Sequence, residues 1–187
     1  MAVERITVLG IGNPLMMDEG VGVRVMEVMM GTLHFPDNVT LIDGGTMGMG
    51  ILNLFRDCDY LLVIDAVDGT GEPPGTVVRL SAEDLAPNQV KHSMHDMRFV
   101  DVLEAAMLMG CRPESDCIGI QIEDMGHVEI GLTPEVEAAV PAAVAAALEV
   151  LAERGINAEV ADTSSAEADI LEAIRTHAAT RRPDRDA

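Results

Sequence analysis

The sequence predicts a single-domain α/β fold, a three-layer α/β/α sandwich with a mainly parallel, twisted sheet. Short apolar, β-branched runs alternate along the chain with stretches whose apolar residues recur at helical spacing. The strand candidates are apolar throughout, which is typical of strands covered by helices on both faces. At 187 residues the chain is long enough to bury its own core.

The first elements follow a β–α–β order. Residues 4–10 (ERITVLG) predict a strand that the following GIGNP segment ends in a turn. Residues 20–30 (GVGVRVMEVMM) carry apolar side chains at helical spacing and predict a helix. Residues 39–42 predict the next strand, which ends at Asp43.

The alternation then repeats. Residues 49–56 predict a short helix, and residues 60–64 (YLLVI) predict a fully apolar strand that ends at Asp65. After the turn-rich GTGEPPG loop, residues 76–80 (TVVRL) predict a further strand at an edge of the sheet. Two of the expected strands therefore end at an aspartate.

The last elements are a helix over residues 97–109, a strand over residues 116–122 and a final helix to about residue 154. The final helix opens at Thr133, a natural N-cap, with Pro134 at its first position. Pro141 falls inside it and is expected to kink or split it. We expect an α/β domain over residues 1–160 and a polar, mobile C-terminal tail over residues 161–187.

Charge and composition exclude several classes of protein. Asp and Glu number 32 against 12 Lys and Arg, and the formal charge of -20 repels nucleic acid and anionic membranes. No apolar run reaches the roughly 18 residues of a spanning helix. Cys58, Cys111 and Cys117 lack zinc-site spacing and indicate free thiols in a reducing compartment. We expect a cytoplasmic monomer without nucleic-acid or membrane partners.

A dinucleotide site is one hypothesis for the first turn, because Gly10 and Gly12 follow a strand and Asp43 ends the next one. Leu15 stands where the G-x-G-x-x-G pattern requires its third glycine. Pro14 and Met16 add bulk where a pyrophosphate needs close backbone approach. A tight strand-to-helix turn explains the two glycines more simply.

Three short segments each place a possible metal ligand just past an apolar run: Glu19 in MDEGVG, Asp65 in LLVIDAVD and His95 in KHSMHDM. Two carboxylates and an imidazole can hold a divalent ion and leave coordination positions open. Glu19 alone is better explained by its place at the positive end of a helix. Asp65 would be desolvated at the end of a central strand unless it is paired or metal-bound. His92 is the local rival of His95.

The loops that hold these residues carry further candidates. Asp43 precedes the Gly44-Gly45-Thr46 loop, which could admit an extended substrate backbone, although Asp-Gly-Gly is also an ordinary turn. We hold Asp43 as a catalytic residue or a support for the metal ligands. Six methionines share these loops: Met16, Met17, Met47, Met49, Met94 and Met97. They either fill irregular gaps or form an adaptable groove for a segment of another protein.

With these residues in place, the chain resembles the hydrogenase maturation endopeptidases, which process the large subunit of nickel-iron hydrogenases. The resemblance spans about residues 6–155 and rests on five blocks in order: VLGIGNPLMMDEGVGVRV, IDGGTMGM, LLVIDAVD followed by PPGTV, HSMHDMRFVDVLEAA, and IGLTPEVEAAV. It implies that Glu19, Asp65 and His95 are the metal-binding residues. The choice of His95 over His92 rests on its spacing to Asp101 in the family pattern.

The resemblance also implies an activity. Such an enzyme is a metal-dependent endopeptidase that removes a short C-terminal extension from the large-subunit precursor after nickel has been inserted. The nickel is then carried by the precursor, and no organic cofactor is expected. The metal could polarise the scissile carbonyl or activate water, which we favour, or Asp43 could serve as general base. The alternative is a nickel-sensing chaperone that binds the same precursor without cutting it.

Overall fold

A computed structural model describes residues 3–81, 105–111, 113–123, 128–161 and 172. Its centre is a five-stranded sheet in the order β3-β1-β4-β6-β5. The strands are β1 (Ile6–Ile11), β3 (Val39–Gly45), β4 (Tyr60–Val67), β5 (Val77–Ser81) and β6 (Glu114–Gln121). All neighbouring pairs are parallel except β5 with β6, so the predicted edge strand is the antiparallel one.

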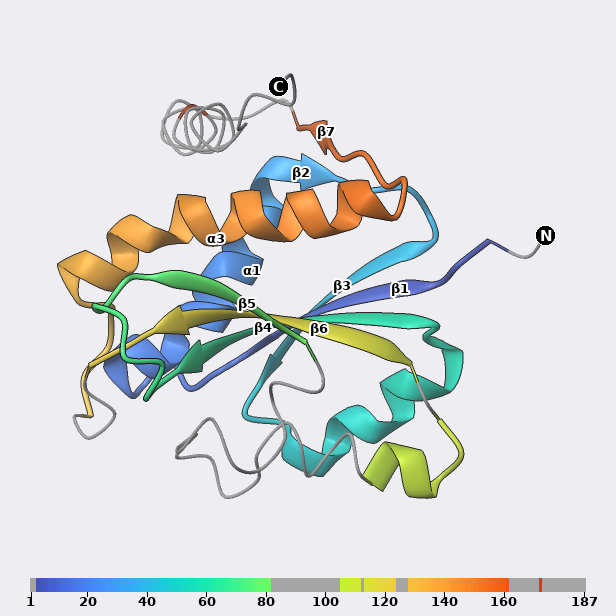
Figure 1. Ribbon diagram of the computed structural model, residues 1–187, viewed down its shortest axis with the longest axis horizontal. Helices are drawn as coiled ribbons and strands as arrows, with labels where there is room; N and C mark the ends of the chain where they lie inside the picture. Colours follow the sequence, from blue (N-terminus) through green and yellow to red (C-terminus); the bar gives the residue numbers. More distant parts are fainter. Residues whose placement is uncertain (1–2, 82–104, 112, 124–127, 162–171, 173–187) are drawn as a thin grey trace, which may run out of the picture.

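Helical segments cover both faces of this sheet, as Figure 1 shows, and the predicted three-layer α/β/α fold is confirmed. The helix α1 (Val21–Thr32) and the helix α3 (Pro134–Glu153) lie on one face. The 3-10 helix η2 (Gly48–Asp57) lies on the other. A shorter 3-10 helix, η1 (Met17–Gly20), leads directly into α1. None of the described helices is long and apolar enough to cross a membrane.

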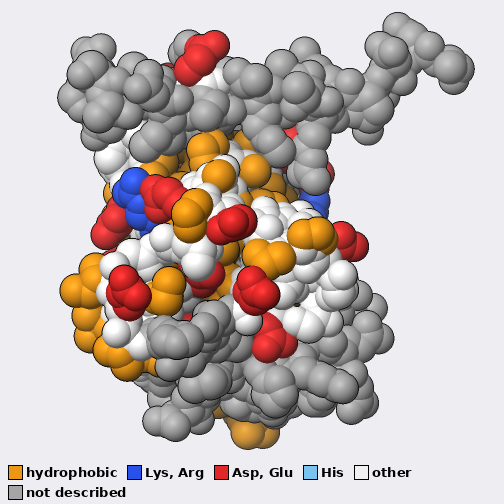
Figure 2. Space-filling model, turned by 90° about the vertical axis from the view of Figure 1, so that its left-hand side faces the viewer, with side chains coloured by type: hydrophobic (Ala, Val, Ile, Leu, Met, Phe, Trp, Pro, Cys, Tyr) orange, Lys and Arg blue, Asp and Glu red, His pale blue; other side chains and the backbone are white. Residues whose placement is uncertain are grey.

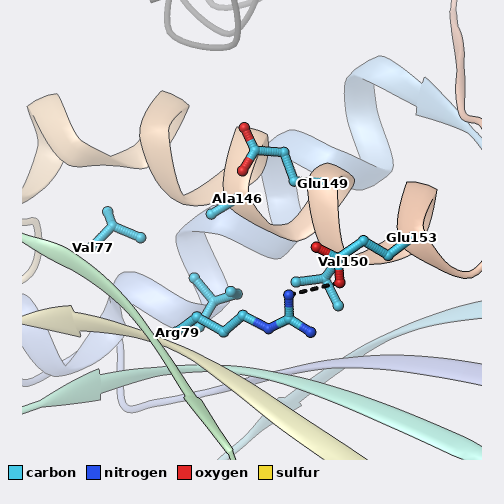
Figure 3. Close-up of a pocket in the computed structure, with 7 residues that line it drawn as sticks. Val77, Arg79, Ala146, Glu149, Val150 and Glu153 are labelled. Carbon is cyan, nitrogen blue, oxygen red and sulfur yellow. Dashed lines mark hydrogen bonds and ion pairs between the residues drawn. The ribbon is translucent and has the colours of Figure 1, made fainter. Parts of the chain in front are cut away.

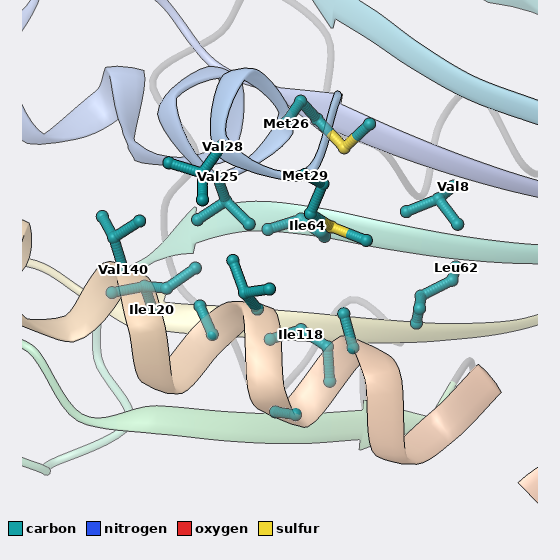
Figure 4. Close-up of a cluster of buried hydrophobic side chains, with 14 of the residues drawn as sticks. Val8, Val25, Met26, Val28, Met29, Leu62, Ile64, Ile118, Ile120 and Val140 are labelled. Carbon is teal, nitrogen blue, oxygen red and sulfur yellow. The ribbon is translucent and has the colours of Figure 1, made fainter. Parts of the chain in front are cut away.

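The larger of two apolar clusters lies between the sheet and the pair of helices α1 and α3. In Figure 4, Val25 and Met29 of α1 face the apolar side chains of β4, while Val140 of α3 lies over β6. Alternate strand residues such as Ile118 and Ile120 supply the sheet side of this cluster. The smaller cluster, around Leu9, Leu61, Val63 and Phe55, fills the space under η2. Burial on both faces explains why β4 reads as a continuous apolar run.

A close backbone contact fixes α1 at the carboxyl ends of β1 and β4. A Cβ added to Gly22 would lie 2.2 Å from the carbonyl oxygen of Ile11 and 2.4 Å from that of Ile64. A Cβ added to Gly10 would lie 2.2 Å from Cγ of Met26. Because no side chain separates the two backbones, the loop before α1 is held directly over the strand ends.

The structure differs from the sequence-based expectation at a few elements. β4 continues two residues past Asp65, so this carboxylate lies within the strand. α3 is one helix of 20 residues that runs through Pro141 without being split. Two short strands that the sequence did not predict, β2 (Leu33–His34) and β7 (Glu159–Val160), pair antiparallel beside α1.

Two predicted segments fall largely outside the described residues. Residues 105–108 are helical, as expected for the end of the helix predicted over residues 97–109, and the rest of that helix is not described. The predicted C-terminal tail is described only at residues 161 and 172, so its mobility stays a prediction.

Candidate functional site

Two of the three predicted metal ligands lie close together at the carboxyl ends of the central strands. Glu19 belongs to η1 and Asp65 to β4, and their exposed fractions are only 3% and 8%. The negative charge of Glu19 contributes to the raised pKa of Asp65, so the two carboxylates are near enough to interact. The tertiary structure thus joins residues 46 positions apart in one acidic site.

Burial is the main reason that the pKa of Asp65 is raised. Its pKa rises from 3.8 to about 8, first because burial disfavours the carboxylate and further because Glu19 is nearby. The Ala66 N–H donates a hydrogen bond of 2.8 Å to Oδ1 of Asp65, which opposes the rise. Without a cation, Asp65 therefore holds a proton at neutral pH. A divalent ion would displace that proton, because metal ligands must be deprotonated.

The backbone of Glu19 packs directly against Gly12 in the turn after β1. A Cβ on Gly12 would lie 2.0 Å from the carbonyl oxygen of Glu19, and Gly12 has a φ of 148°. The Asn13 N–H donates to the same Glu19 oxygen at 3.2 Å. The glycine therefore serves to seat Glu19, and no room is left there for a pyrophosphate. This geometry argues against the dinucleotide hypothesis.

Asp18 is a structural residue of the site whose role the sequence did not reveal. It is fully buried, and it accepts hydrogen bonds from the backbone N–H and the hydroxyl of Thr133, at 2.7 and 3.0 Å. Thr133 does stand at the N-cap position of α3, but its hydroxyl bonds Asp18 and makes no capping bond within the helix. Asp18 thus fixes η1, and with it Glu19, to the start of α3. Because Asp18 and Glu19 are adjacent acidic residues, no sequence pattern indicates which of them is buried against Thr133.

Asp43, the possible catalytic residue, is exposed and separate from the two buried carboxylates. It pairs with Gly10 on β1, and β1 lies between β3 and β4. Oδ1 of Asp43 accepts a 3.0 Å hydrogen bond from the Gly45 N–H, which makes a tight turn at the end of β3. Its role stays a prediction. Like Asp65, it lies toward the carboxyl ends of the strands, and strand β1 separates the two residues.

The third predicted ligand, His95, and its rival His92 lie outside the described residues, so the convergence of all three ligands stays a prediction. Within the described ranges, no group of three or more His, Cys, Asp or Glu side chains could hold a metal ion. Of the six loop methionines, Met16 and Met17 are half-buried beside Glu19, and Met47 is exposed after β3. Met94 and Met97 are not described, nor is the side chain of Met49.

The three cysteines are free thiols, as predicted, and the two buried ones, Cys58 and Cys117, make poor nucleophiles. Burial raises the pKa of Cys117 well above its usual value, and the nearby Asp65 and Asp116 carboxylates raise it further. Burial also raises the pKa of Cys58, whose thiol donates to the Tyr60 carbonyl at 3.0 Å. Both thiols therefore stay protonated at neutral pH.

A hollow of about 200 Å³ between β5 and α3 is a rival location for a site, and Figure 3 shows it. Arg79, the cation among its lining residues, already binds Glu153 at 2.8 Å and Asp116 at 2.6 Å. Arg79 is therefore already occupied by two carboxylates of the protein and is not available to bind a ligand. The hollow lies against the sheet edge at β5, whereas Glu19 and Asp65 lie at the central strands.

A parallel α/β fold with buried carboxylates at the carboxyl ends of its strands is typical of α/β enzymes. A family profile described as hydrogenase maturation protease matches residues 23–150. The hydrogenase 2 maturation protease of Escherichia coli K12 is 37% identical over 155 residues, 82% of this chain and 94% of that protein. The hydrogenase expression/formation protein HoxM of Azotobacter vinelandii is 40% identical over 166 residues, 87% of this chain and 79% of the relative.

Solved structures agree with the sequence relatives. The hydrogenase maturating endopeptidase HybD from E. coli superposes with a TM-score of 0.76 at 35% identity, covering 86% of this chain and 99% of that chain. The [NiFe] hydrogenase maturation protease HybD from Thermococcus kodakarensis gives a TM-score of 0.65 at 27% identity, covering 78% and 98%. The chain therefore belongs to the hydrogenase maturation protease family, and it is a peptide hydrolase.

Proposed function

We propose that this enzyme removes a C-terminal extension from the nickel-loaded large-subunit precursor of a nickel-iron hydrogenase. In this proposal the nickel arrives with the precursor, and Glu19, Asp65 and His95 complete its coordination. Relatives named as hydrogenase 2 and [NiFe] hydrogenase maturation proteases support the choice of substrate. The family resemblance of the MHDM segment supports His95 as the third ligand.

The observation that carries the proposal is the buried pair of Glu19 and Asp65. Two carboxylates brought together away from water repel each other, and one of them must stay protonated unless a cation lies between them. A divalent ion supplies that positive charge and favours oxygen and imidazole ligands. A pair of buried acids in which burial favours the protonated form of Asp65 is thus suited to a divalent ion that arrives with the substrate.

The chemistry of the cut follows from where the metal would sit. Nickel held between precursor and enzyme fixes the scissile peptide against the strand ends and can polarise its carbonyl or activate a water. Asp43 is exposed and is separated from Asp65 by strand β1, and it could instead accept a proton from that water. We favour metal-assisted attack. An Asp43→Asn variant separates the two routes, since only a general base loses its function when the carboxylate becomes an amide.

The experiment is processing of purified precursor, with and without bound nickel, followed by the shortening of the large subunit on a gel. We expect wild type to cleave only the nickel-loaded form. His95→Ala should abolish cleavage because it removes one of three ligands, while the thermal unfolding midpoint stays near that of wild type. His92→Ala, three residues earlier in the chain, is the matched control and should cleave normally.

Each outcome discriminates between hypotheses. Equal cleavage of nickel-loaded and nickel-free precursor, or equal cleavage by His95→Ala and wild type, would show that the enzyme does not recognise the metal. A nickel-dependent complex that forms without any shortening of the precursor would favour the chaperone alternative.

A further inference from the structure

A pocket with largely apolar walls lies against η1, the 3-10 helix that contains Glu19. It has a volume of about 220 Å³, comparable to the roughly 150 Å³ cavity that accepts a benzene-sized ligand. Its walls come from two loops and the start of α1, namely from Pro14, Met17, Gly20, Val23, Ile130 and Leu132. Met17 and Gly20 are the first and last residues of η1, the same four-residue helix that contains Glu19. The pocket and the acidic site therefore share one structural element.

The backbone at Met17 is held in a conformation that side chains disfavour. Its φ of 46° makes it the only residue other than glycine with a positive φ in the described part of the chain. The Met17 N–H donates to the Glu129 carbonyl at 2.9 Å, and the bonds from Asp18 to Thr133 fix the next residue. These contacts hold the methionine side chain at the pocket wall. Disfavoured backbone of this kind is typical of ligand-binding sites.

Apolar side chains around the pocket are exposed to solvent. Ile130 is 80% exposed although it lines the pocket, and Leu15, next to Pro14, is 56% exposed. Figure 2 views this side of the molecule, and apolar and acidic side chains lie interspersed on its described surface. Apolar surface that is exposed at a pocket beside a catalytic site is typical of a binding surface.

The rim of the pocket is acidic. Glu27 and Glu137 line it, and its single cation, Arg24, is already paired with both of them, at 3.4 and 3.2 Å. Glu129 is exposed on the adjoining loop. An occupant that matches this surface carries an apolar side chain for the pocket and Lys or Arg next to it for the rim.

From these observations we infer that the pocket binds a segment of the precursor that adjoins the peptide presented to Glu19 and Asp65, through an apolar side chain flanked by basic residues. The inference rests on the proposed function, because its occupant is the substrate of that function. It assigns Met17 and Ile130 to substrate docking. Docking in this pocket contributes equally to the binding of the precursor and of its transition state, so it lowers KM and leaves kcat unchanged.

The test compares KM and kcat for nickel-loaded precursor among full-length variants. Ile130→Ser and Met17→Gly should each raise KM about tenfold, the size expected for losing an apolar contact in a pocket, and leave kcat unchanged. Met17→Gly should unfold at the wild-type temperature or above it, because glycine adopts a positive φ without strain. The matched control is Met30→Ser, an exposed methionine of α1 outside the pocket, which should behave as wild type.

A second pair of variants tests the charge of the rim. Glu27→Lys should raise KM about threefold or more and make KM less sensitive to salt, because one attraction to the basic occupant is replaced by a repulsion. The matched control is Glu149→Lys, which makes the same change of charge on α3. Glu149 lies 12 residues, or about 18 Å, along the helix from Glu137, so the control should leave KM unaltered.

The outcomes separate this inference from the proposed function. If wild type does not process the precursor, the proposed function fails. If wild type processes it while Ile130→Ser and Met17→Gly keep the wild-type KM, or if Met30→Ser raises KM as much as they do, the docking role is wrong and the proposed function stands. Self-association of wild type that Ile130→Ser abolishes, measured by light scattering, would make a second copy the occupant and also overturn the inference.

Discussion

At the scale of single residues, the buried carboxyl of Asp65 makes the stability of the metal-free fold depend on pH. A carboxyl that folding buries next to Glu19 holds its proton more tightly than it does in the unfolded chain. Between the unfolded pKa of 3.8 and the folded pKa of about 8, the folded state binds more protons than the unfolded state. The metal-free protein therefore loses stability as pH rises through this interval.

The Asp65→Asn variant should remove that pH dependence. The amide keeps an oxygen for the Ala66 N–H but has no proton to lose. Since one pKa unit corresponds to about 1.4 kcal/mol, we expect Asp65→Asn to match wild type near pH 4 and to exceed it by about 2–4 kcal/mol at pH 8. Urea denaturation from pH 4 to 9 with a chelator present measures this difference. Parallel stability curves for the two proteins would contradict it, and the same variant should not process precursor.

At the scale of secondary-structure elements, the contact between α1 and the sheet depends on glycine. Gly22→Ala would place a methyl group within about 2.4 Å of two carbonyl oxygens, so α1 must move away from β1 and β4. We expect a loss of about 3 kcal/mol in the free energy of unfolding, at the upper end for an overpacked position. Gly50→Ala is the matched control, because its Cβ would meet only Met47 atoms at 3.7 Å or more. Equal stability of the two variants would show that α1 tolerates the displacement.

The bond between η1 and α3 is a second contact between elements that can be tested. Asp18→Ala leaves the N–H and the hydroxyl of Thr133, which are partly buried, without their acceptor. Hydrogen bonds to a charged group contribute about 1.5–3 kcal/mol each, so we expect a loss of about 3 kcal/mol by urea denaturation. Asp37→Ala, at an exposed turn, should change stability by less than about 0.5 kcal/mol. A similar small effect at Asp18 would show that water replaces its oxygens.

At the scale of the whole molecule, the acidic excess is much larger than the ion pairs can neutralise. Four arginines, Arg5, Arg24, Arg79 and Arg154, each contact two carboxylates. With 32 acidic residues and a formal charge of -20, most carboxylates have no such cation available. Their mutual repulsion favours expanded states over the compact one.

Salt should therefore stabilise this protein. Raising NaCl from about 0.05 to 0.5 M shortens the Debye length from more than 10 Å to about 4 Å, which screens the repulsion. We expect the thermal unfolding midpoint at pH 7 to rise by several degrees. Choline chloride at equal ionic strength is the control and should give the same rise, since the effect needs no specific binding of sodium. A midpoint that stays constant or falls would mean that the ion pairs outweigh the repulsion.

The order of elements could be predicted because each rests on local signals. β-branched apolar runs, helical spacing and glycine or proline turns predicted β1, β3, β4, β5, β6, α1 and most of α3. Local signals did not predict the features that depend on tertiary contacts. The proline inside α3 does not split the helix, because the apolar faces on both sides of it, including Val140 and Ala143, pack against the same core. β2 and β7 have two residues each and exist only through their pairing.

For the site, the sequence by itself determined the candidate residues, since carboxylates that follow apolar strands in a parallel α/β fold collect at one edge of the sheet. Only the tertiary structure decided which of them interact. Glu19 approaches Asp65 because Gly12 and Gly22 let the backbones meet, and Asp43 stays apart because β1 lies between. Asp18 and Glu19 are neighbours with the same chemistry, yet one binds Thr133 and the other joins the acidic pair. The burial of a carboxylate and its distance from other charges arise only when the chain packs. These two properties set the pKa of the carboxylate, and therefore the charge that it carries.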